Sequence, residues 1–106
     1  EYNFFTKDYS RVKAKDALKP GKHTLNIRYD HPKNPSKYAQ GGAVTLTVDG
    51  QEAGKGQLDR IVPYVFSFTE TFDIGMDLGS VVSPKYSAKA PFAFEGKIKN
   101  VVVNID

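Results

Sequence analysis

Three carboxylates lie close together in one glycine-containing stretch of the chain. Glu70, Asp73 and Asp77 fall within eight residues, and Gly75 and Gly79 lie among or just after them. Calcium takes several oxygen ligands from flexible loops of this kind, so the stretch is a candidate metal site. The spacing differs from that of an EF-hand, and carboxylates in turns also accept backbone N–H groups. A calcium site and an acidic turn therefore both remain open.

The two histidines, His23 and His31, are the other candidates for metal binding or catalysis, because the chain has no cysteine. Disulfides, thiolate zinc sites and cysteine nucleophiles are excluded. His23 lies at the start of a predicted strand and His31 at the start of a predicted loop, so we interpret both as surface residues. No serine stands in a Gly-x-Ser-x-Gly frame, and no phosphate-binding glycine loop is present. We expect no catalytic residue in this chain.

Aromatic rings are candidates for ligand binding. The chain has 7 Phe and 6 Tyr but no Trp. Tyr38, Tyr64 and Tyr86 are candidates to stack on sugar rings, and two of them lie in or near long predicted loops. The alternative is that all three pack in the core or within the loops. The absence of Trp, which has the largest flat face, weakens the carbohydrate interpretation.

Length and charge limit the classes of protein. The 106 residues predict a single domain over residues 1–106, and the formal charge is 15 − 12 = +3. The lysines are scattered and form no single stripe, so we expect no nucleic-acid partner. No apolar run approaches the roughly 18 residues of a membrane helix, so we expect no membrane partner. Because the chain starts at Glu1 instead of Met, we expect a fragment or a processed form.

Alternating apolar side chains predict the strands that must position these residues. Residues 22–30 and 43–49 each alternate with period two, as a half-buried strand does. Asp49 and Gly50 then predict a tight hairpin turn into an antiparallel strand over residues 51–58. The glycines within that returning strand indicate a bulge or a close approach of another backbone.

Further strands are predicted over residues 2–5, 61–68, 71–74 and 96–105. Two long loops, residues 31–42 and 75–91, exceed about 12 residues and are therefore expected to be functional or mobile. Short strands between turns rich in Gly and Pro predict an all-β fold. We expect a two-sheet antiparallel β-sandwich of the jelly-roll or concanavalin-like kind.

An ordered series of short motifs runs through nearly the whole chain, from about Tyr2 to Ile105. In chain order the motifs are Pro20–Thr24, Gly41–Gly50, Gly54–Gly56, Val62–Pro63, Phe66–Ser67, Glu70–Gly75, Asp77, Gly79–Ser80, Val82–Ser83 and Phe94–Ile98. In order and spacing this series resembles the C-terminal domain of long bacterial arylsulfatases, which belong to the sulfatase family.

The resemblance implies a β-sandwich behind a sulfatase catalytic domain. In that family the catalytic domain hydrolyses sulfate esters. It uses a formylglycine, made from the first residue of a Cys/Ser-x-Pro-x-Arg motif, and a bound divalent metal, usually calcium. This chain has no Cys, and none of its serines begins that motif, so no catalytic residue of the family is present. The resemblance therefore implies that the chemistry of a parent arylsulfatase lies upstream of Glu1, and it favours a periplasmic or secreted location.

The resulting expectation is a non-catalytic C-terminal accessory domain of an arylsulfatase-like sulfuric ester hydrolase. It would pack on, or border, the upstream catalytic domain of the same chain, with no cofactor of its own. The alternative is a carbohydrate-binding module for sulfated glycans, which the mildly basic charge and the loop tyrosines would suit. A third class is a structural domain stabilised by calcium at the acidic stretch.

Overall fold

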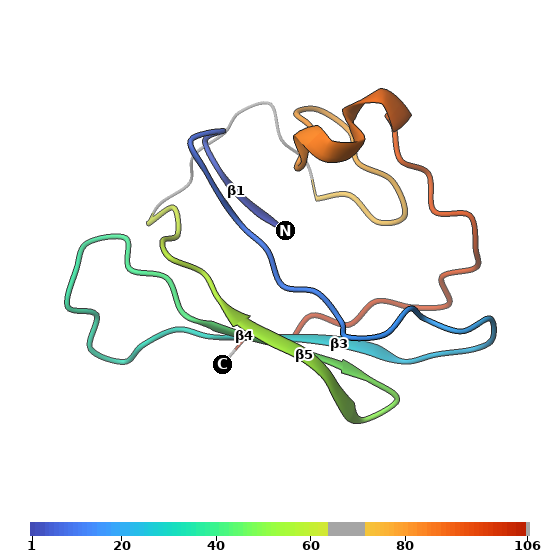
Figure 1. The fold of residues 1–106 in the computed structure, drawn as a ribbon, viewed down its shortest axis with the longest axis horizontal. Coiled ribbons are helices and arrows are strands. Elements are labelled where there is room, and N and C mark those ends of the chain that lie inside the picture. The colour runs from blue at the N-terminus through green and yellow to red at the C-terminus, as the bar shows by residue number, and fades with distance from the viewer. Residues whose placement is uncertain (64–71, 106) are drawn as a thin grey trace. The chain divides into compact units, whose positions relative to one another are not determined.

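The computed structural model of the chain describes residues 1–63 and 72–105. Its contacts divide the chain into two compact units, with the division after residue 66. Regular structure in the described residues is almost entirely strand, with one short 3₁₀ helix, which confirms the predicted strand-rich class (Figure 1). Within this part of the chain no helix is long and apolar enough to cross a membrane.

The first unit contains a three-stranded antiparallel sheet. It is built from β3 (Leu25–Asp30), β4 (Ala43–Val48) and β5 (Gln51–Gln57), in the order β3-β4-β5. These strands confirm those predicted over residues 22–30 and 43–49 from alternation and over residues 51–58 from the hairpin turn. Asp49 and Gly50 form the turn from β4 to β5, with φ angles of 51° and 81°. Positive φ at both turn residues is what a tight type I′ hairpin requires.

One side of this sheet carries its apolar side chains. Leu25, Ile27 and Tyr29 of β3 stand opposite Val48, Leu46 and Val44 of β4, and opposed residues share a face. Across β4, Leu46 and Val44 stand opposite Gly54 and Gly56 of β5, so the apolar side ends on two glycines. The register shifts between Leu46 and Thr47, which confirms the irregularity predicted for this hairpin.

The glycines of β5 admit the backbone of residues 12–15. A Cβ at Gly54 would collide with the carbonyl oxygen of Lys13, and a Cβ at Gly56 would lie 2.7 Å from Val12 Cγ2. The N–H of Lys15 donates to the carbonyl of Ala53 at 2.9 Å. The predicted close backbone approach is therefore confirmed at Gly54, whereas Gly56 makes room for the side chain of Val12.

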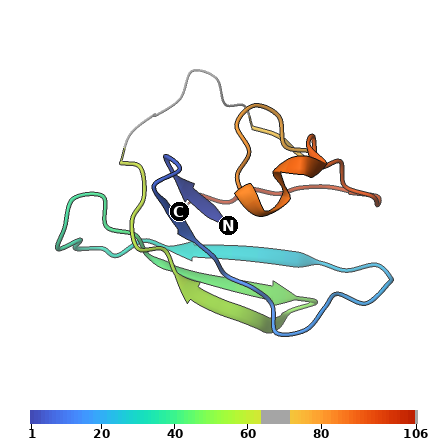
Figure 2. The ribbon, with the colours of Figure 1, turned by 45° about the horizontal axis from the view of Figure 1, so that its top comes forward.

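The opening segment forms a hairpin of β1 (Tyr2–Phe4) and β2 (Asp8–Ser10). β1 confirms the strand predicted over residues 2–5, whereas β2 was not predicted. The hydroxyl of Tyr2 accepts from the N–H of Val62 at 2.7 Å. Burial raises the pKa of Tyr29, and the nearby Tyr2 raises it further. Figure 2 shows the hairpin lying over one side of the three-stranded sheet.

Val44 is the one buried large hydrophobic side chain in the described residues, with 8% of its surface exposed. It lies on β4 at the end of the apolar side where Tyr29 and Gly56 are its neighbours. The core of the first unit therefore sits where residues of the opening segment meet the sheet.

The second unit contains a short 3₁₀ helix, η1 (Pro84–Lys89), and loops. Ser83 is 1% exposed and caps η1, with its hydroxyl accepting from the N–H of Lys85 at 3.3 Å. The N–H of Phe94 donates to the carbonyl of Gly75 at 2.7 Å, which joins the two ends of the long loop.

The strand predicted over residues 96–105 is wrong, because this range contains no regular strand. Val101, Val103 and Ile105 alternate in the sequence, but a strand also needs a neighbour for its backbone hydrogen bonds. Among the described residues none bonds to the backbone of 97–105. Residues 61–63 and 72–74 are not in strands either. The other residues of the strands predicted over 61–68 and 71–74 lie outside the described ranges.

Candidate functional site

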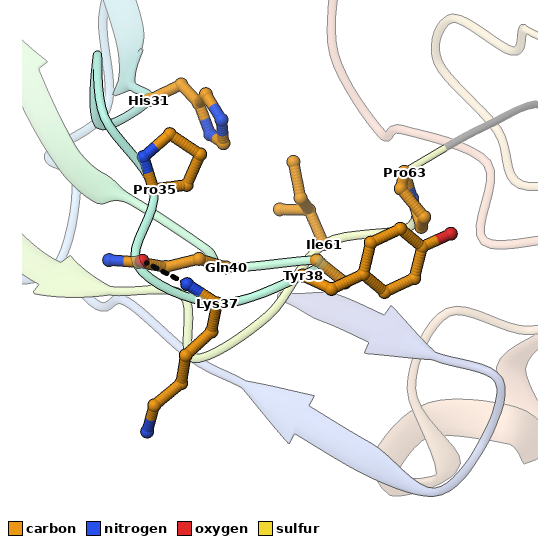
Figure 3. Close-up of a pocket in the computed structure, with 8 residues that line it drawn as sticks. His31, Pro35, Lys37, Tyr38, Gln40, Ile61 and Pro63 are labelled. Atoms are coloured by element: carbon orange, nitrogen blue, oxygen red, sulfur yellow. Dashed lines mark hydrogen bonds between the residues drawn. The ribbon is translucent and has the colours of Figure 1, made fainter.

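The first unit contains a pocket of about 250 Å³ between the loop that follows β3 and the segment that follows β5 (Figure 3). Its lining is mostly apolar with a few polar groups, a composition typical of small-ligand sites. The lining residues are His31, Pro35, Lys37, Tyr38, Ala39, Gln40, Ile61 and Pro63.

Gln40 holds the loop side of the pocket in place. Its Oε1 accepts from the N–H of Ser36 at 2.6 Å and from the N–H of Lys37 at 3.3 Å. The N–H of Ile61 donates to the carbonyl of Ala39 at 2.9 Å, which ties the loop to the other wall. Because these bonds use backbone groups on both sides of Tyr38, they fix the position of that residue's backbone.

The loop ends on Gly41 and Gly42, which are both buried. A Cβ at Gly41 would collide with the carbonyl of Leu58, and a Cβ at Gly42 would collide with the carbonyl of Asp30. The N–H of Leu58 donates to the carbonyl of Gly42 at 2.9 Å. Only glycine fits this close approach, so the sequence Gly-Gly anchors the base of the loop to the sheet.

Tyr38 is open to solvent, with 77% of its surface exposed. Figure 3 shows the ring reaching toward Pro63, whereas the side chain of Lys37 leads away from both. The Nδ1 of His31 lies 3.0 Å from the hydroxyl of Tyr29. The lining of the pocket thus includes an exposed aromatic ring and, separately, an imidazole.

Tyr86, another predicted sugar-binding residue, does not line this pocket. The ring of Tyr86 packs edge-on against Phe92 in the second unit, with 4.6 Å between the ring centres, and 37% of Tyr86 is exposed. Tyr64 lies outside the described residues. Of the three candidates, Tyr38 lines the pocket described above.

Two carboxylates of the acidic stretch bind backbone N–H groups. Asp73 Oδ2 accepts from the N–H of Leu78 at 2.9 Å, and Asp77 Oδ2 accepts from the N–H of Val82 at 3.3 Å. Carboxylates that accept from backbone N–H groups are what the acidic-turn interpretation of this stretch expects. Glu70 lies outside the described residues, and within them no group of three His, Cys, Asp or Glu side chains is placed to hold a metal. The calcium site stays a prediction.

His23 makes contacts that the sequence did not predict. Its Nδ1 lies 2.7 Å from Asp49 Oδ2, and its Nε2 lies 2.8 Å from the carbonyl oxygen of Lys19. The hydrogen bond with Asp49 raises the pKa of His23, and the bond to the Lys19 carbonyl raises it further. The N–H of Thr24 and then His23 lower the pKa of Asp49. Because these partners are 26 residues apart, no local pattern in the sequence could have indicated the pair.

A second candidate surface lies on β3. Leu25 is 61% exposed and Ile27 is 75% exposed, although both stand on the apolar side of the sheet. We call these two residues the open row. Tyr29, the next apolar residue of the strand, is 39% exposed. The apolar side is thus covered near Tyr29 and uncovered at the open row.

Comparisons of the chain with family models, curated proteins and solved structures found no match.

Proposed function

We propose that the chain is a non-catalytic accessory module that docks, through the open row, on the catalytic domain of an arylsulfatase-like sulfuric ester hydrolase. The observation that carries the docking proposal is the exposure of Leu25 and Ile27, at 61% and 75%, on the apolar side of a sheet. The identity of the partner domain comes from the resemblance of the motif series to arylsulfatase C-terminal domains.

The exposed side chains supply a driving force for docking. Burying one Leu or Ile side chain contributes about 1.5–3 kcal/mol. Single exposed apolar residues are ordinary on protein surfaces, but Leu25 and Ile27 are neighbours on one face and adjoin the half-buried Leu46 and Val48. A contiguous apolar patch of this kind is typical of a surface that another domain covers.

We also propose that the two sheets are layers of the sandwich that the sequence predicts. The apolar side of the β3-β4-β5 sheet faces residues 12 and 13 at Gly56 and Gly54, as the inner face of a sandwich layer faces its cover. In this proposal the sandwich is closed near Tyr29 and left open at Leu25 and Ile27, where the partner domain completes the cover. The jelly-roll connection of the strands stays a prediction.

The docking proposal is tested with a separately produced arylsulfatase catalytic domain that lacks its C-terminal region. Binding of the chain to that domain is measured by calorimetric titration. We expect saturable binding that Ile27→Lys weakens at least about tenfold, because a charge would have to be buried in the interface.

Asn26→Lys is the matched control, because Asn26 is the adjacent exposed residue of β3 and points to the opposite face. It adds the same charge to the same strand and should leave binding unchanged. Equal binding by the Ile27→Lys variant and the unaltered chain would refute the open row as the docking surface. Assembly of the chain into dimers that Ile27→Lys abolishes would assign the open row to a second copy instead.

A further inference from the structure

We infer that the pocket beside Tyr38 binds an anionic saccharide, with one sugar ring against the tyrosine ring. This inference is independent of docking by the open row, because the two surfaces share no residue. It rests on an accessible ring, on polar groups at the pocket wall and on the charge of the loop.

The ring of Tyr38 would be the surface on which a sugar ring packs. It is 77% exposed, and it borders a pocket whose other wall contains Ile61 and Pro63. The C–H face of a sugar packs well on an aromatic ring, and a small pocket beside it would hold the edge of that sugar. The backbone bonds of Gln40 and Ala39 already fix the loop, so little ordering of the loop backbone is needed on binding.

Polar atoms at the pocket are available for hydroxyl groups. The Nδ1 of His31 lies against the Tyr29 hydroxyl, which leaves Nε2 as the ring nitrogen that can bond to a ligand. The hydroxyl of Tyr38 has no hydrogen-bond partner within the described residues. Each can donate to or accept from a sugar hydroxyl.

The charge of the loop favours an anionic sugar over a neutral one. Residues 31–42 contain Lys33 and Lys37 and no Asp or Glu, which gives +2 with His31 neutral. Asp30, just before the loop, is paired with Arg28 at 2.8 Å. Lys37 lines the pocket, and its flexible four-carbon stem lets its ammonium turn toward a bound anion. The loop that forms one wall of the pocket is therefore net positive and carries no carboxylate of its own, which favours an anionic ligand.

The test is an NMR titration of the chain with each of three tetrasaccharides. They are neutral cellotetraose, unsulfated chondroitin and chondroitin sulfate. We expect saturable shifts at the amides of residues 37–40 and 61–62. Both anionic ligands should bind at least about fivefold more tightly than cellotetraose, and raising the salt concentration should reduce this difference. The two anionic arms show whether sulfate or carboxylate is preferred.

Variants locate the binding. Tyr38→Ala should weaken binding about tenfold, whereas Tyr38→Phe, which keeps the ring, should stay within about twofold. Phe72→Ala is the matched control, because Phe72 is 78% exposed and lies outside the pocket, and it should bind as the unaltered chain does. Ile27→Lys should also leave saccharide binding unchanged. The saccharide proposal and the docking proposal can therefore be refuted independently of each other.

Three results would overturn the inference. These are the absence of saturable binding to either anionic tetrasaccharide, full binding by Tyr38→Ala, and equal affinity for cellotetraose and the anionic ligands.

Discussion

His23 and Asp49 form the best-defined contact between side chains that are distant in sequence. Both ring nitrogens of His23 face acceptors, a carboxylate and a carbonyl oxygen, so both must carry a proton for both bonds to form. The imidazolium is therefore the form that this geometry favours. The contact joins the start of β3 to the β4–β5 turn, and the N–H of Thr24 adds a further bond to Asp49.

The pair makes stability depend on pH. The pKa of His23 is raised in the folded chain, so its contribution is complete below the ordinary histidine pKa of about 6.5 and is lost as pH rises through the folded-state value. The pKa of Asp49 is lowered, so its contribution is present above its ordinary pKa of about 3.9 and is lost as pH falls through the folded-state value. We expect the contribution of the pair to the free energy of unfolding to be largest between about pH 4 and 6.5.

Urea unfolding at a series of pH values measures this dependence. Asp49→Asn is the sharp variant, because Asn keeps the turn preference and tolerates the φ of 51° at this position while removing the charge. In this variant the free energy of unfolding should fall less, as pH rises above neutral, than it does in the unaltered chain. An unchanged pH profile in Asp49→Asn would show that the pair does not set it.

At the scale of single residues the sequence predicted roles that depend on near neighbours. Asp73 and Asp77 bond to N–H groups five residues ahead, which turn chemistry anticipates. Packing of Tyr86 within the loops was one of the two interpretations of that residue, but its partner Phe92 was not predicted. The partner of His23 was not predicted either, because it depends on how distant parts of the chain meet.

Among the elements, β5 packs closely against the opening segment because it contains two glycines, although glycine has a low strand propensity. Gly54 and Gly56 weaken a strand in general, yet here they let residues 12 and 13 lie against the sheet. The apolar side of the sheet is thereby covered at β5 by the backbone of Lys13 and the side chain of Val12.

Gly54→Ala tests this packing. The added Cβ would collide with the backbone carbonyl of Lys13, which cannot rotate away as a side chain could. We expect a loss of about 1–3 kcal/mol in the free energy of unfolding, measured by urea denaturation. Lys55→Ala, at the exposed position between the glycines, should change stability by no more than about 0.5 kcal/mol. A Gly54→Ala variant as stable as the unaltered chain would contradict the close approach.

Alternation predicted β3 and β4, and the turn residues predicted β5. The predictions succeeded because the alternating pattern and the turn both indicate the same antiparallel sheet. Asp49 and Gly50 set the turn, and the strands on both sides pair in the register that it allows. The same reasoning failed over residues 96–105. Alternation identifies which side chains share a face, but it does not supply the neighbouring strand that a ladder requires.

At the scale of the whole molecule, the sequence predicted an all-β fold and a sheet with one apolar side. It did not predict how evenly that side is covered. Leu25, Ile27 and Tyr29 belong to one pattern, yet their exposures of 61%, 75% and 39% differ, because coverage depends on where distant segments lie. The Tyr38 pocket was only half predicted: the ring was named, but its wall at Ile61 and Pro63 is a tertiary feature.

Docking through the open row requires that Leu25 and Ile27 are accessible to solvent in the chain alone. NMR of methyl groups in the presence of a soluble paramagnetic agent measures this directly, because the agent broadens only the signals that it can approach. We predict strong broadening for the methyl groups of Leu25 and Ile27 and little for those of Val44, which is 8% exposed. Equal protection of all three residues would mean that the chain covers its own apolar side, and it would contradict the proposed docking surface.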